Sequence, residues 1–470
     1  MNLKFKPIAF ESFISKPGKV SYETITAVVY FFVLAIDLSD TYMVNVALPS
    51  IKQHFILHHI NVAWVLTSYL LSFLSVIPLS GWLGDKFSTK KILLIALIFY
   101  VIGSFLSGIS GSIYFLLICR FLQGIGGGLL VPVGQSIMFK VFPKESLAKA
   151  LGLIGFAALV GPSCATVLGG TLVNYFSWRC VFFINIPIVI VSLLIVFCRI
   201  KESKHTDPGS IDILGMLLSV SFLSGFLLLL SSIGNHADVS RQSGIEILLL
   251  LGLLTFFIKH ELRKDKPLID LKVFLIKEYS VCQSVIFLSL ISAMGSIFLT
   301  TLFFQDGLKL SPLNASLLIF PLPLGLLLMF IMIKRLYNLL GTRVTVISGL
   351  LIYSLLTLLM LSIKSASHVI YIWLIMFGRG IGFGMLNVPL QVTAFQKIQS
   401  QQIGRASAVW NTFRCLSNIL GIALFAMVLT YIEKMQGSSV GLFPYYICFI
   451  VCAVLGFMAL GITTLLPKEI

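Results

Sequence analysis

The chain has 470 residues, of which 58% are hydrophobic and only 11% are charged, and its formal net charge is +16. Soluble globular proteins carry about 25% charged residues, so this composition excludes a soluble enzyme, and the apolar content excludes a disordered chain. A mean hydropathy of +1.01 predicts membrane-spanning helices rather than a β-barrel, whose strands give weaker, alternating segments.

Apolar segments long enough to cross a bilayer follow one another along the whole chain. A spanning helix needs about 20 predominantly apolar residues. The basic N-terminal segment has no cleavage site, so we interpret it as a tail and not as a signal peptide. The fourteen predicted spans are 25–47, 61–83, 92–111, 113–137, 146–170, 180–200, 212–234, 244–259, 280–304, 312–333, 344–363, 368–390, 404–432 and 444–466.

The positive charges are distributed unevenly between the two sets of loops. With the N-terminus inside, the inner tails and loops hold 25 Lys and Arg residues and the outer loops hold 6. Because cytoplasmic loops are enriched in Lys and Arg, both termini are predicted to lie in the cytoplasm, and the protein in the cytoplasmic (inner) membrane. The same asymmetry accounts for the net charge without a nucleic-acid partner.

Two long charged stretches, Arg199–Asp212 and Lys259–Glu278, bracket the seventh and eighth spans. They predict an all-α polytopic protein of two six-helix halves separated by a two-helix insert. Glycine-rich runs that begin at Gly124 and Gly380 resemble each other, which suggests related halves. The predicted divisions are a tail at 1–24, halves at 25–200 and 280–466, linkers and insert at 201–279, and a tail at 467–470.

Ionisable residues inside the spans are few, and each is a candidate for function. Asp37 and Asp40 are three residues apart in the first span and therefore lie near one helix face. Two carboxylates in a poorly hydrated site disfavour double ionisation, so at least one of them, in the first place Asp40, is expected to take up and release a proton as access alternates. Arg120 in the fourth span is the expected partner. The alternative is a fixed ion pair that only joins helices.

Arg379 and Arg414 lie in spans of the second half, where the sequence places no acid deep in a span. The membrane interior is thus predicted to hold three cations and two anions. An anionic or carboxylate-bearing substrate would offset that excess. Pairing with backbone carbonyls or with an acid of the first span is the alternative.

The segment from Gly81 to Lys91 is predicted to be an inner loop that acts as a gate. Its glycines allow helices to approach closely, and its acid can accept hydrogen bonds from a neighbouring helix end in one conformation only. The residues assigned to this gating loop are Gly81, Gly84, Asp85, Lys90 and Lys91.

Other motifs are interpreted as structural. Gly124, Gly126 and Gly128 follow no strand, so they predict close helix packing rather than a nucleotide loop. The three histidines of the first outer loop are expected to be solvated rather than to bind a metal. Neither a metal nor another cofactor is expected, and the sequence holds no metalloprotease motif, P-loop or nucleophile–base set. These histidines are His54, His58 and His59.

Several separate motifs resemble the major facilitator superfamily, specifically its fourteen-helix drug:proton antiporter-2 branch. The resemblance covers nearly the whole chain, and the motifs occur in the right order. They are Asp40–Pro49 in the first span, Trp64 and Tyr69 in the second, Gly81–Lys91, Arg120 with Gly124 in the fourth, and Ser177–Pro187 at the entry to the sixth. In this family Asp40 takes the acidic position, Asp85 the gating acid, and Arg120 the arginine implicated in proton coupling.

The chain also departs from the family pattern. Ser88 and Thr89 replace a usual Gly and Arg. The helix-five antiporter motif keeps its outer pairs but has Ala165-Thr166 between them, so close packing is expected to survive without the helix bend. The retained pairs, assigned to helix packing, are Gly161-Pro162 and Gly169-Gly170.

The resemblance implies a monomeric carrier with alternating access, driven by the proton gradient, that exports small lipophilic compounds. Export of one endogenous anionic metabolite, such as a carboxylate siderophore, fits the excess of arginine. Uptake remains open because of the helix-five departure, and a non-transporting membrane sensor is the alternative from another class. The sequence identifies no periplasmic adaptor partner.

Overall fold

The computed structural model describes residues 22–141, 164–202, 212–236, 241–264, 271–396, 398, 403–436 and 441–466. Within these ranges, eleven helices are long and apolar enough to cross a membrane. The chain is therefore an all-α, multi-pass membrane protein, as predicted. The number of fourteen spans stays a prediction. The second predicted span has a shorter apolar core, Asn61–Ile77, the eighth is not among the eleven, and much of the fifth lies outside the described residues.

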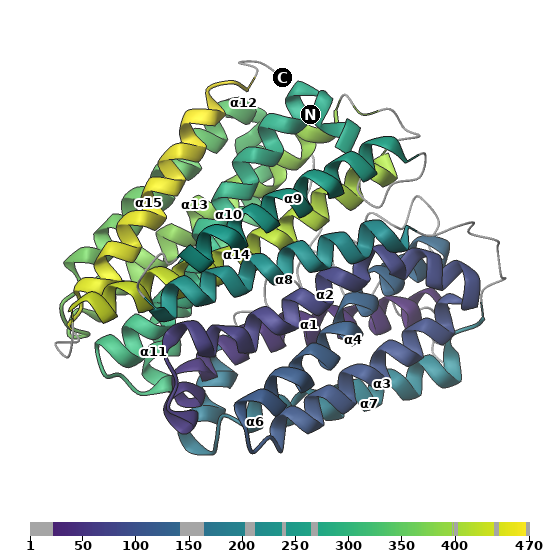
Figure 1. Ribbon diagram of the computed structural model, residues 1–470, viewed down its shortest axis with the longest axis horizontal. Helices are drawn as coiled ribbons and strands as arrows, with labels where there is room; N and C mark the ends of the chain where they lie inside the picture. Colours follow the sequence, from purple (N-terminus) through teal and green to yellow (C-terminus); the bar gives the residue numbers. More distant parts are fainter. Residues whose placement is uncertain are drawn as a thin grey trace, which may run out of the picture.

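The first group of helices packs around α4, which contacts α1, α2 and α3, while α7 contacts α1 and α3 (Figure 1). Residues 164–175 are also helical. Ile184 separates α6 from α7 within the predicted sixth span. The bounds are α1 Tyr22–Phe55, α2 His59–Phe87, α3 Thr89–Gly108, α4 Ile113–Val141, α6 Cys180–Phe183 and α7 Asn185–Arg199.

The second group repeats this pattern of neighbours, with α13 against α10 and α12, and α15 against α10 and α12. Phe320 separates α11 from α12, which divides the predicted span 312–333. A second break follows at Gly341, whose φ of 73° is left-handed, so α12 is two helices joined at a sharp turn. The bounds are α10 Lys277–Leu302, η3 Phe303–Gly307, α11 Pro312–Ile319, α12 Pro321–Leu359, η4 Met360–Ser362, α13 Val369–Phe395, α14 Ile403–Gln436 and α15 Phe443–Thr463.

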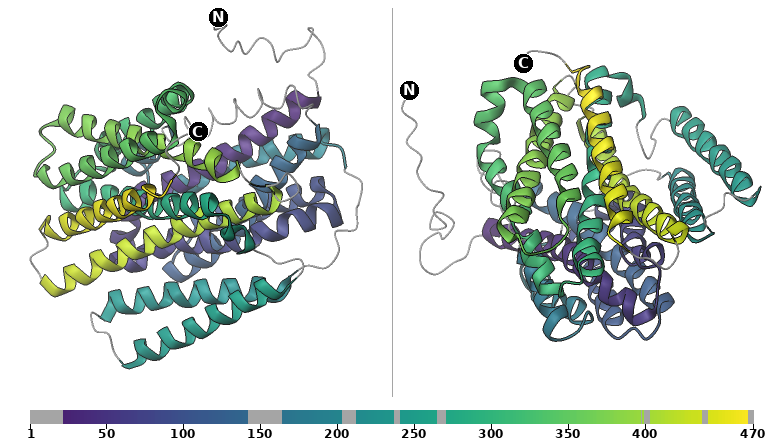
Figure 2. Two further views of the ribbon diagram at one scale, coloured as in Figure 1. Left: turned by 90° about the horizontal axis from the view of Figure 1, so that it is seen from above. Right: turned by 90° about the vertical axis from the view of Figure 1, so that its left-hand side faces the viewer.

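The insert is a helical hairpin on the outside of the bundle, formed by α8 (Ile213–His236) and α9 (Arg241–Arg263), with η2 (Leu271–Leu275) after it (Figure 2). α8 contacts α2 of the first group and α14 of the second. The hairpin therefore lies beside the seam between the two groups. α9 is longer than the predicted span 244–259.

One end of the hairpin is held by a charged cluster around Asp212. Lys264 Nζ lies 2.6 Å and His260 Nε2 2.9 Å from Asp212 Oδ1, and the Gly215 amide donates to the same oxygen at 3.0 Å. Burial alone would raise the pKa of this carboxyl, but the hydrogen bonds from Lys264, Gly215 and His260 lower it to about 2. The cluster fixes the start of α8 against the end of α9.

Candidate functional site

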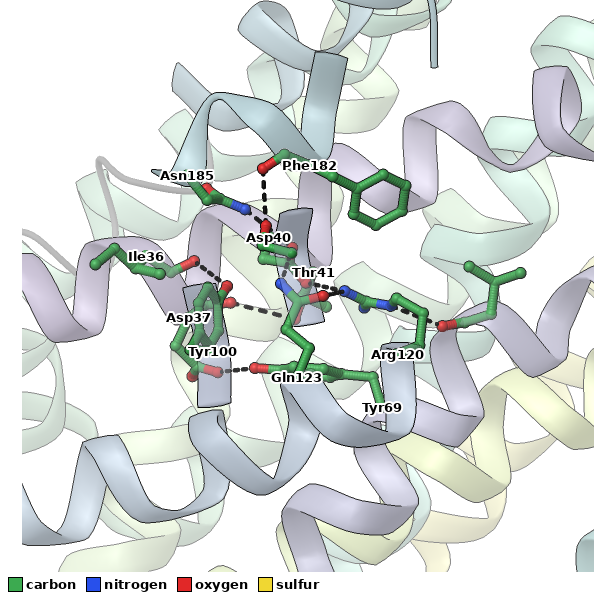
Figure 3. Close-up of polar contacts among 12 residues, drawn as sticks. Ile36, Asp37, Asp40, Thr41, Tyr69, Tyr100, Arg120, Gln123, Phe182 and Asn185 are labelled. Carbon is green, nitrogen blue, oxygen red and sulfur yellow. Dashed lines mark hydrogen bonds and ion pairs between the residues drawn. The ribbon is translucent and has the colours of Figure 1, made fainter. Parts of the chain in front are cut away.

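Asp40 and Arg120 form an ion pair inside the first group of helices (Figure 3). Arg120 Nη1 lies 2.7 Å from Asp40 Oδ2, and neither side chain is exposed. Gln123 of α4 and Asn185 of α7 each donate to Asp40 Oδ1 at 3.0 Å. Asp40 therefore accepts three N–H donors, an arrangement suited to an ionised carboxylate. Sequence reasoning missed the two amides, because neutral polar residues in spans carry no charge signal.

The Arg120 guanidinium is enclosed on its remaining sides. Its Nε donates to the Val65 carbonyl at 3.1 Å, and its carbon lies 4.4 Å from the Tyr69 ring centre and 5.6 Å from that of Phe182. A desolvated cation over an aromatic face gains about 2 kcal/mol. Nη2 has no hydrogen-bond partner within the described residues. The cation is thus held by α1, α2, α4 and α6 together.

Asp37 lies one turn before Asp40 on α1 but has different surroundings. Its Oδ1 accepts a hydrogen bond of 2.6 Å from the Tyr69 hydroxyl, and its side chain is half-buried rather than fully buried. Its partner Tyr69 lies on α2, the helix that packs against α14 of the second group. Asp37 thus lies at the seam between the two groups, whereas Asp40 lies inside the first. Tyr69 connects them, because its ring covers Arg120 and its hydroxyl binds Asp37.

Arg379 of α13 is buried among hydroxyl groups of α10. Only 1% of it is exposed. It donates to Ser296 Oγ, and its Nη1 lies 3.4 Å from Thr300 Oγ1. The Tyr353 ring centre lies 5.7 Å from its guanidinium carbon. These contacts replace the carbonyl or carboxylate partners that the sequence suggested.

Arg414 lies five residues after the start of the apolar part of α14, Val409–Gln436, and its side chain is exposed. It follows directly after Phe413, which packs against α10 through Phe287. Arg414 therefore differs from Arg379, whose guanidinium is enclosed by side chains of α10, α12 and α13.

The two groups are joined by polar contacts at the end of the bundle that holds the α1–α2 turn. We call this the outer end, following the predicted orientation, and the opposite end the inner end. Lys52 Nζ lies 2.6 Å from Asp306 Oδ2 of η3, and His59 Nε2 lies 3.0 Å from Glu433 Oε1 of α14. Lys52 Nζ is also 3.0 Å from His59 Nε2. We call these four residues the outer cluster.

Two further contacts join α1 to the second group nearer the middle of the bundle. Gln305 of η3 donates to the Val46 carbonyl of α1 at 2.9 Å, and Asn45 Nδ2 lies 3.4 Å from Thr301 Oγ1 of α10. η3 is a π-helical turn, a feature often found at functional sites. The outer ends of the two groups are thus tied by several bonds between α1 and the α10–η3 segment.

The expectation of solvated histidines is wrong for His59. It is buried, with 2% exposed, because the start of α2 packs against α14. Its ring meets Tyr445 edge-on, with 6.4 Å between the ring centres. His54 and His58 are exposed. Sequence reasoning also missed the acids of the outer cluster, because charges near span ends are common and only the fold shows which of them meet.

Comparison with known proteins agrees with this architecture. The Major Facilitator Superfamily model matches residues 30–422. The chain belongs to the Major Facilitator Superfamily. Among curated superfamily relatives, "Putative multidrug resistance protein MdtD" of Shigella sonnei is 28% identical over 404 residues, covering 83% of each chain. The protein of the same name from Escherichia coli K12 is similar to the same extent.

Solved structures of superfamily transporters share the fold at low sequence identity. The xylose transporter of E. coli, in a partially occluded inward-open conformation, gives a TM-score of 0.61 at 16% identity, over 94% of this chain and 98% of the other. A peptide transporter in complex with sulfate gives 0.66 at 15% identity, over 94% and 95%. At these identities the likeness establishes the fold alone.

The structure corrects the predicted gating loop. Most of this superfamily segment is helical, because α2 continues to Phe87 and α3 begins at Thr89. Only Ser88 separates them, with φ 81° and ψ 131°, where the superfamily motif usually has glycine. Lys90 donates to the Phe197 carbonyl at 2.9 Å and so binds the last turn of α7, while Lys91 is exposed. The Asp85 side chain and the surroundings of Gly81 lie outside the described residues.

The glycines assigned to packing lie at helix contacts. A Cβ at Gly124 or Gly128 would meet the backbone of α2, and one at Gly126 the backbone of α3. One at Gly169 would meet Met43 of α1, and one at Gly170 would meet Ser316 and the Pro312 carbonyl of α11. The three glycines of α4 allow this helix to approach α2 and α3 closely. Gly170 allows the helix at 164–175 to approach α11 of the second group. Gly161 and Pro162 lie outside the described residues.

Proposed function

We propose that this superfamily member is a proton-coupled exporter of small lipophilic compounds in the cytoplasmic membrane, with both termini in the cytoplasm. The observation that supports this most is the pair of carboxylates on α1 with a buried arginine inside otherwise apolar helices. Such residues in spans mark proton or substrate pathways. The relatives named as multidrug resistance proteins support the class of substrate.

The two acids are proposed to have different tasks. Asp40 is fully buried and fully hydrogen-bonded, so it holds Arg120 in place. Asp37 is half-buried at the seam and accepts a hydrogen bond from the neutral Tyr69 hydroxyl, so it is the group that a proton can reach. When Asp37 is neutral, the site around Arg120 gains one net positive charge. That change alters the electrostatic interaction between this site on the first group and charged groups on α14 of the second group.

Alternating access requires that cargo and protons bind the two conformations with different affinities. The outer cluster and the Gln305 contact tie the outer ends together in this conformation. Cargo is proposed to enter from the inner side, and the outer contacts to break before its release. Protons from the outer side then reach Asp37 and return the carrier. No cofactor takes part in this scheme.

Transport by everted vesicles tests the proposal. Asp37→Asn should lower proton-coupled efflux of a lipophilic cation by about 100-fold while counterflow of the same solute persists, since the carboxyl carries the proton and not the fold. Thr41→Val, one turn later on α1, is the matched control, because the Thr41 hydroxyl only donates to the Asp37 carbonyl of its own helix. Full coupled activity of Asp37→Asn and Asp40→Asn would overturn proton coupling at this pair.

Export of one anionic metabolite is the second candidate, and the exposed Arg414 side chain favours it. A guanidinium in the first half of α14 can bind a carboxylate in a fork-like geometry. Arg414→Gln should then abolish transport of anionic substrates and spare lipophilic cations. Equal loss for both classes would show that the arginine does not select substrates.

We also expect a monomer that needs no adaptor protein to move its cargo. It lies in the lipid bilayer and takes its energy from the proton gradient. A sensor that carries no solute is the alternative from another class. Counterflow of a radiolabelled solute in proteoliposomes separates the two, because only a carrier shows it.

A further inference from the structure

A cavity of about 200 Å³ lies between the insert and the seam of the bundle. α2 and α14 form the wall on the side of the bundle, and α8 and α9 form the wall on the side of the lipid. Leu271 of η2 closes one end. The seam elements come from different six-helix groups, so the cavity touches both of the parts that alternating access would move. The residues that line it most directly are Leu74, Leu223, Leu254, Phe257, Phe413 and Leu416.

The wall of the cavity offers a ligand few hydrogen bonds. Two of its three hydroxyl groups bind their own helices, because Ser75 donates to the Leu71 carbonyl at 2.7 Å and Ser219 to the Met216 carbonyl at 2.9 Å, and the third belongs to Thr412. Both serines are thereby satisfied. An apolar cavity of about 150 Å³ stays dry and takes up hydrocarbons. This larger space therefore suits a hydrocarbon chain better than water or a polar solute.

The cavity lies at the depth of the inner leaflet. Ser219 is six residues from the start of α8, which places it about 9 Å from the inner end of the hairpin. Phe257 is likewise six residues from the end of α9. A lipid whose headgroup lies at the inner surface could reach this space with the first part of its chain.

Positive charge surrounds the inner end of the same elements. Two acids, Asp212 and Glu261, lie at this end of the hairpin, and Lys264 pairs with Asp212 at 2.6 Å. Clusters of basic side chains directly cytoplasmic to a span attract anionic headgroups. The exposed basic residues on α9, η2 and the start of α10 are Lys259, Arg263, Lys272 and Lys277.

We propose that the insert holds an anionic phospholipid of the inner leaflet, with one acyl chain in the cavity and its phosphate near the basic residues of α9 and η2. The chain would fill the space between the hairpin and the α2–α14 seam. The lipid would thereby support the position of the insert against both groups. This site does not depend on proton coupling or on the class of cargo.

Photo-crosslinking tests the proposal in the full-length protein. Nanodiscs would contain phosphatidylglycerol with a diazirine on its acyl chain, and the labelled peptides would be mapped by mass spectrometry. Labels should concentrate on the wall of the cavity in α8, α9 and α14. Ser219→Leu should lower them by about tenfold, since the added side chain fills the space. Ser221→Leu is the matched control, because Ser221 is exposed on α8 and does not line the cavity.

A second variant and a second lipid keep the test decisive. Thr412→Leu narrows the cavity from α14 and should lower the labelling as Ser219→Leu does. If one of the two variants does not fold, the other still tests the proposal. A phosphatidylcholine probe with the same chain should label less than the phosphatidylglycerol probe. Arg263→Gln or Lys272→Gln should each lower the ratio of phosphatidylglycerol to phosphatidylcholine labelling by about fivefold. Equal labelling by both lipids, or unchanged labelling in both cavity variants, would overturn the proposal. Displacement of the probe by a lipophilic cation would also overturn it, by making the cavity a cargo site.

Discussion

Asp37 and Asp40 are separated by one turn of α1, yet they bind opposite kinds of partner. Asp40 Oδ2 lies 2.7 Å from a guanidinium nitrogen of Arg120 and has no exposed surface, whereas Asp37 Oδ1 accepts a hydrogen bond from a neutral hydroxyl at 2.6 Å and is half-buried. The fold thus places a fixed charge pair beside a carboxyl that can be reached. This division allows one acid to exchange protons without breaking the helix contacts that the other maintains.

The first prediction concerns the stability of the buried pair. Arg120→Met leaves the Asp40 carboxylate without its cation, and such a loss costs about 3–5 kcal/mol. The double variant Arg120→Met/Asp40→Asn should recover at least half of that cost, because no unpaired charge remains. Chemical unfolding in detergent measures both. Additive losses in the double-mutant cycle would show that the two residues do not stabilise each other.

The second prediction concerns the outer cluster. Glu433→Gln weakens the contact to His59, and Lys52→Met removes the ion pair with Asp306. These side chains are 3–20% exposed, so each contact is expected to be worth about 1 kcal/mol and its loss to shift the population about fivefold toward an outward-open form. The rate at which an impermeant maleimide labels Thr301→Cys from outside reports that form.

The matched control for the outer cluster is Lys434→Met. Lys434 follows Glu433 on α14 but is exposed. Its replacement removes a nearby charge without removing a bond between the groups. Labelling that rises as much in Lys434→Met as in Glu433→Gln would assign the effect to net charge and contradict a latch.

The third prediction concerns the turn between α2 and α3. Ser88 has φ 81° and ψ 131°, a conformation that costs a residue with a Cβ about 1–3 kcal/mol. Ser88→Gly should therefore stabilise the protein by about 1 kcal/mol and raise its melting temperature. Ser88→Ala is the control, since it removes the hydroxyl but keeps the Cβ. A gain with alanine equal to that with glycine would show that the backbone conformation is not the cause.

The sequence predicted the buried pair because charged residues within spans are rare enough to be matched with one another. Asp40 and Arg120 were the simplest match within the first half, and the structure joins them. The outer cluster could not be predicted in this way. Lys52, His59 and Glu433 lie near span ends, where charges are ordinary, and their pairing depends on how two helix groups meet in space.

The helix pattern was predictable to a similar extent. Apolar runs located most spans, because a bilayer needs continuous apolar length. The breaks at Phe320 and Gly341 were not visible, since helices in a membrane tolerate glycine and proline. The gating segment was assigned to a loop for the opposite reason. Its charges suggested solvent, whereas the helices continue to Phe87 and resume at Thr89.

The last prediction concerns the charged cluster around Asp212 at the inner end of the insert. The pKa of Asp212 is lowered to about 2 in the folded protein, against an ordinary value of 3.8. A lowered pKa means that the carboxylate stabilises the fold at every pH above the unfolded value and loses this effect as the pH falls through the folded one. Titration of Asp212 itself therefore changes stability only below about pH 4.

Asp212→Asn removes the negative charge that pairs with Lys264 and His260 and should cost about 1–3 kcal/mol at neutral pH. Amide hydrogen exchange at the first turn of α8 should then be about tenfold faster, since 1.4 kcal/mol corresponds to that factor. The difference in melting temperature between the two proteins should shrink from pH 4 to pH 2. A difference that grew with acidification would mean that the carboxyl is protonated in the fold, because only a raised pKa gives that sign.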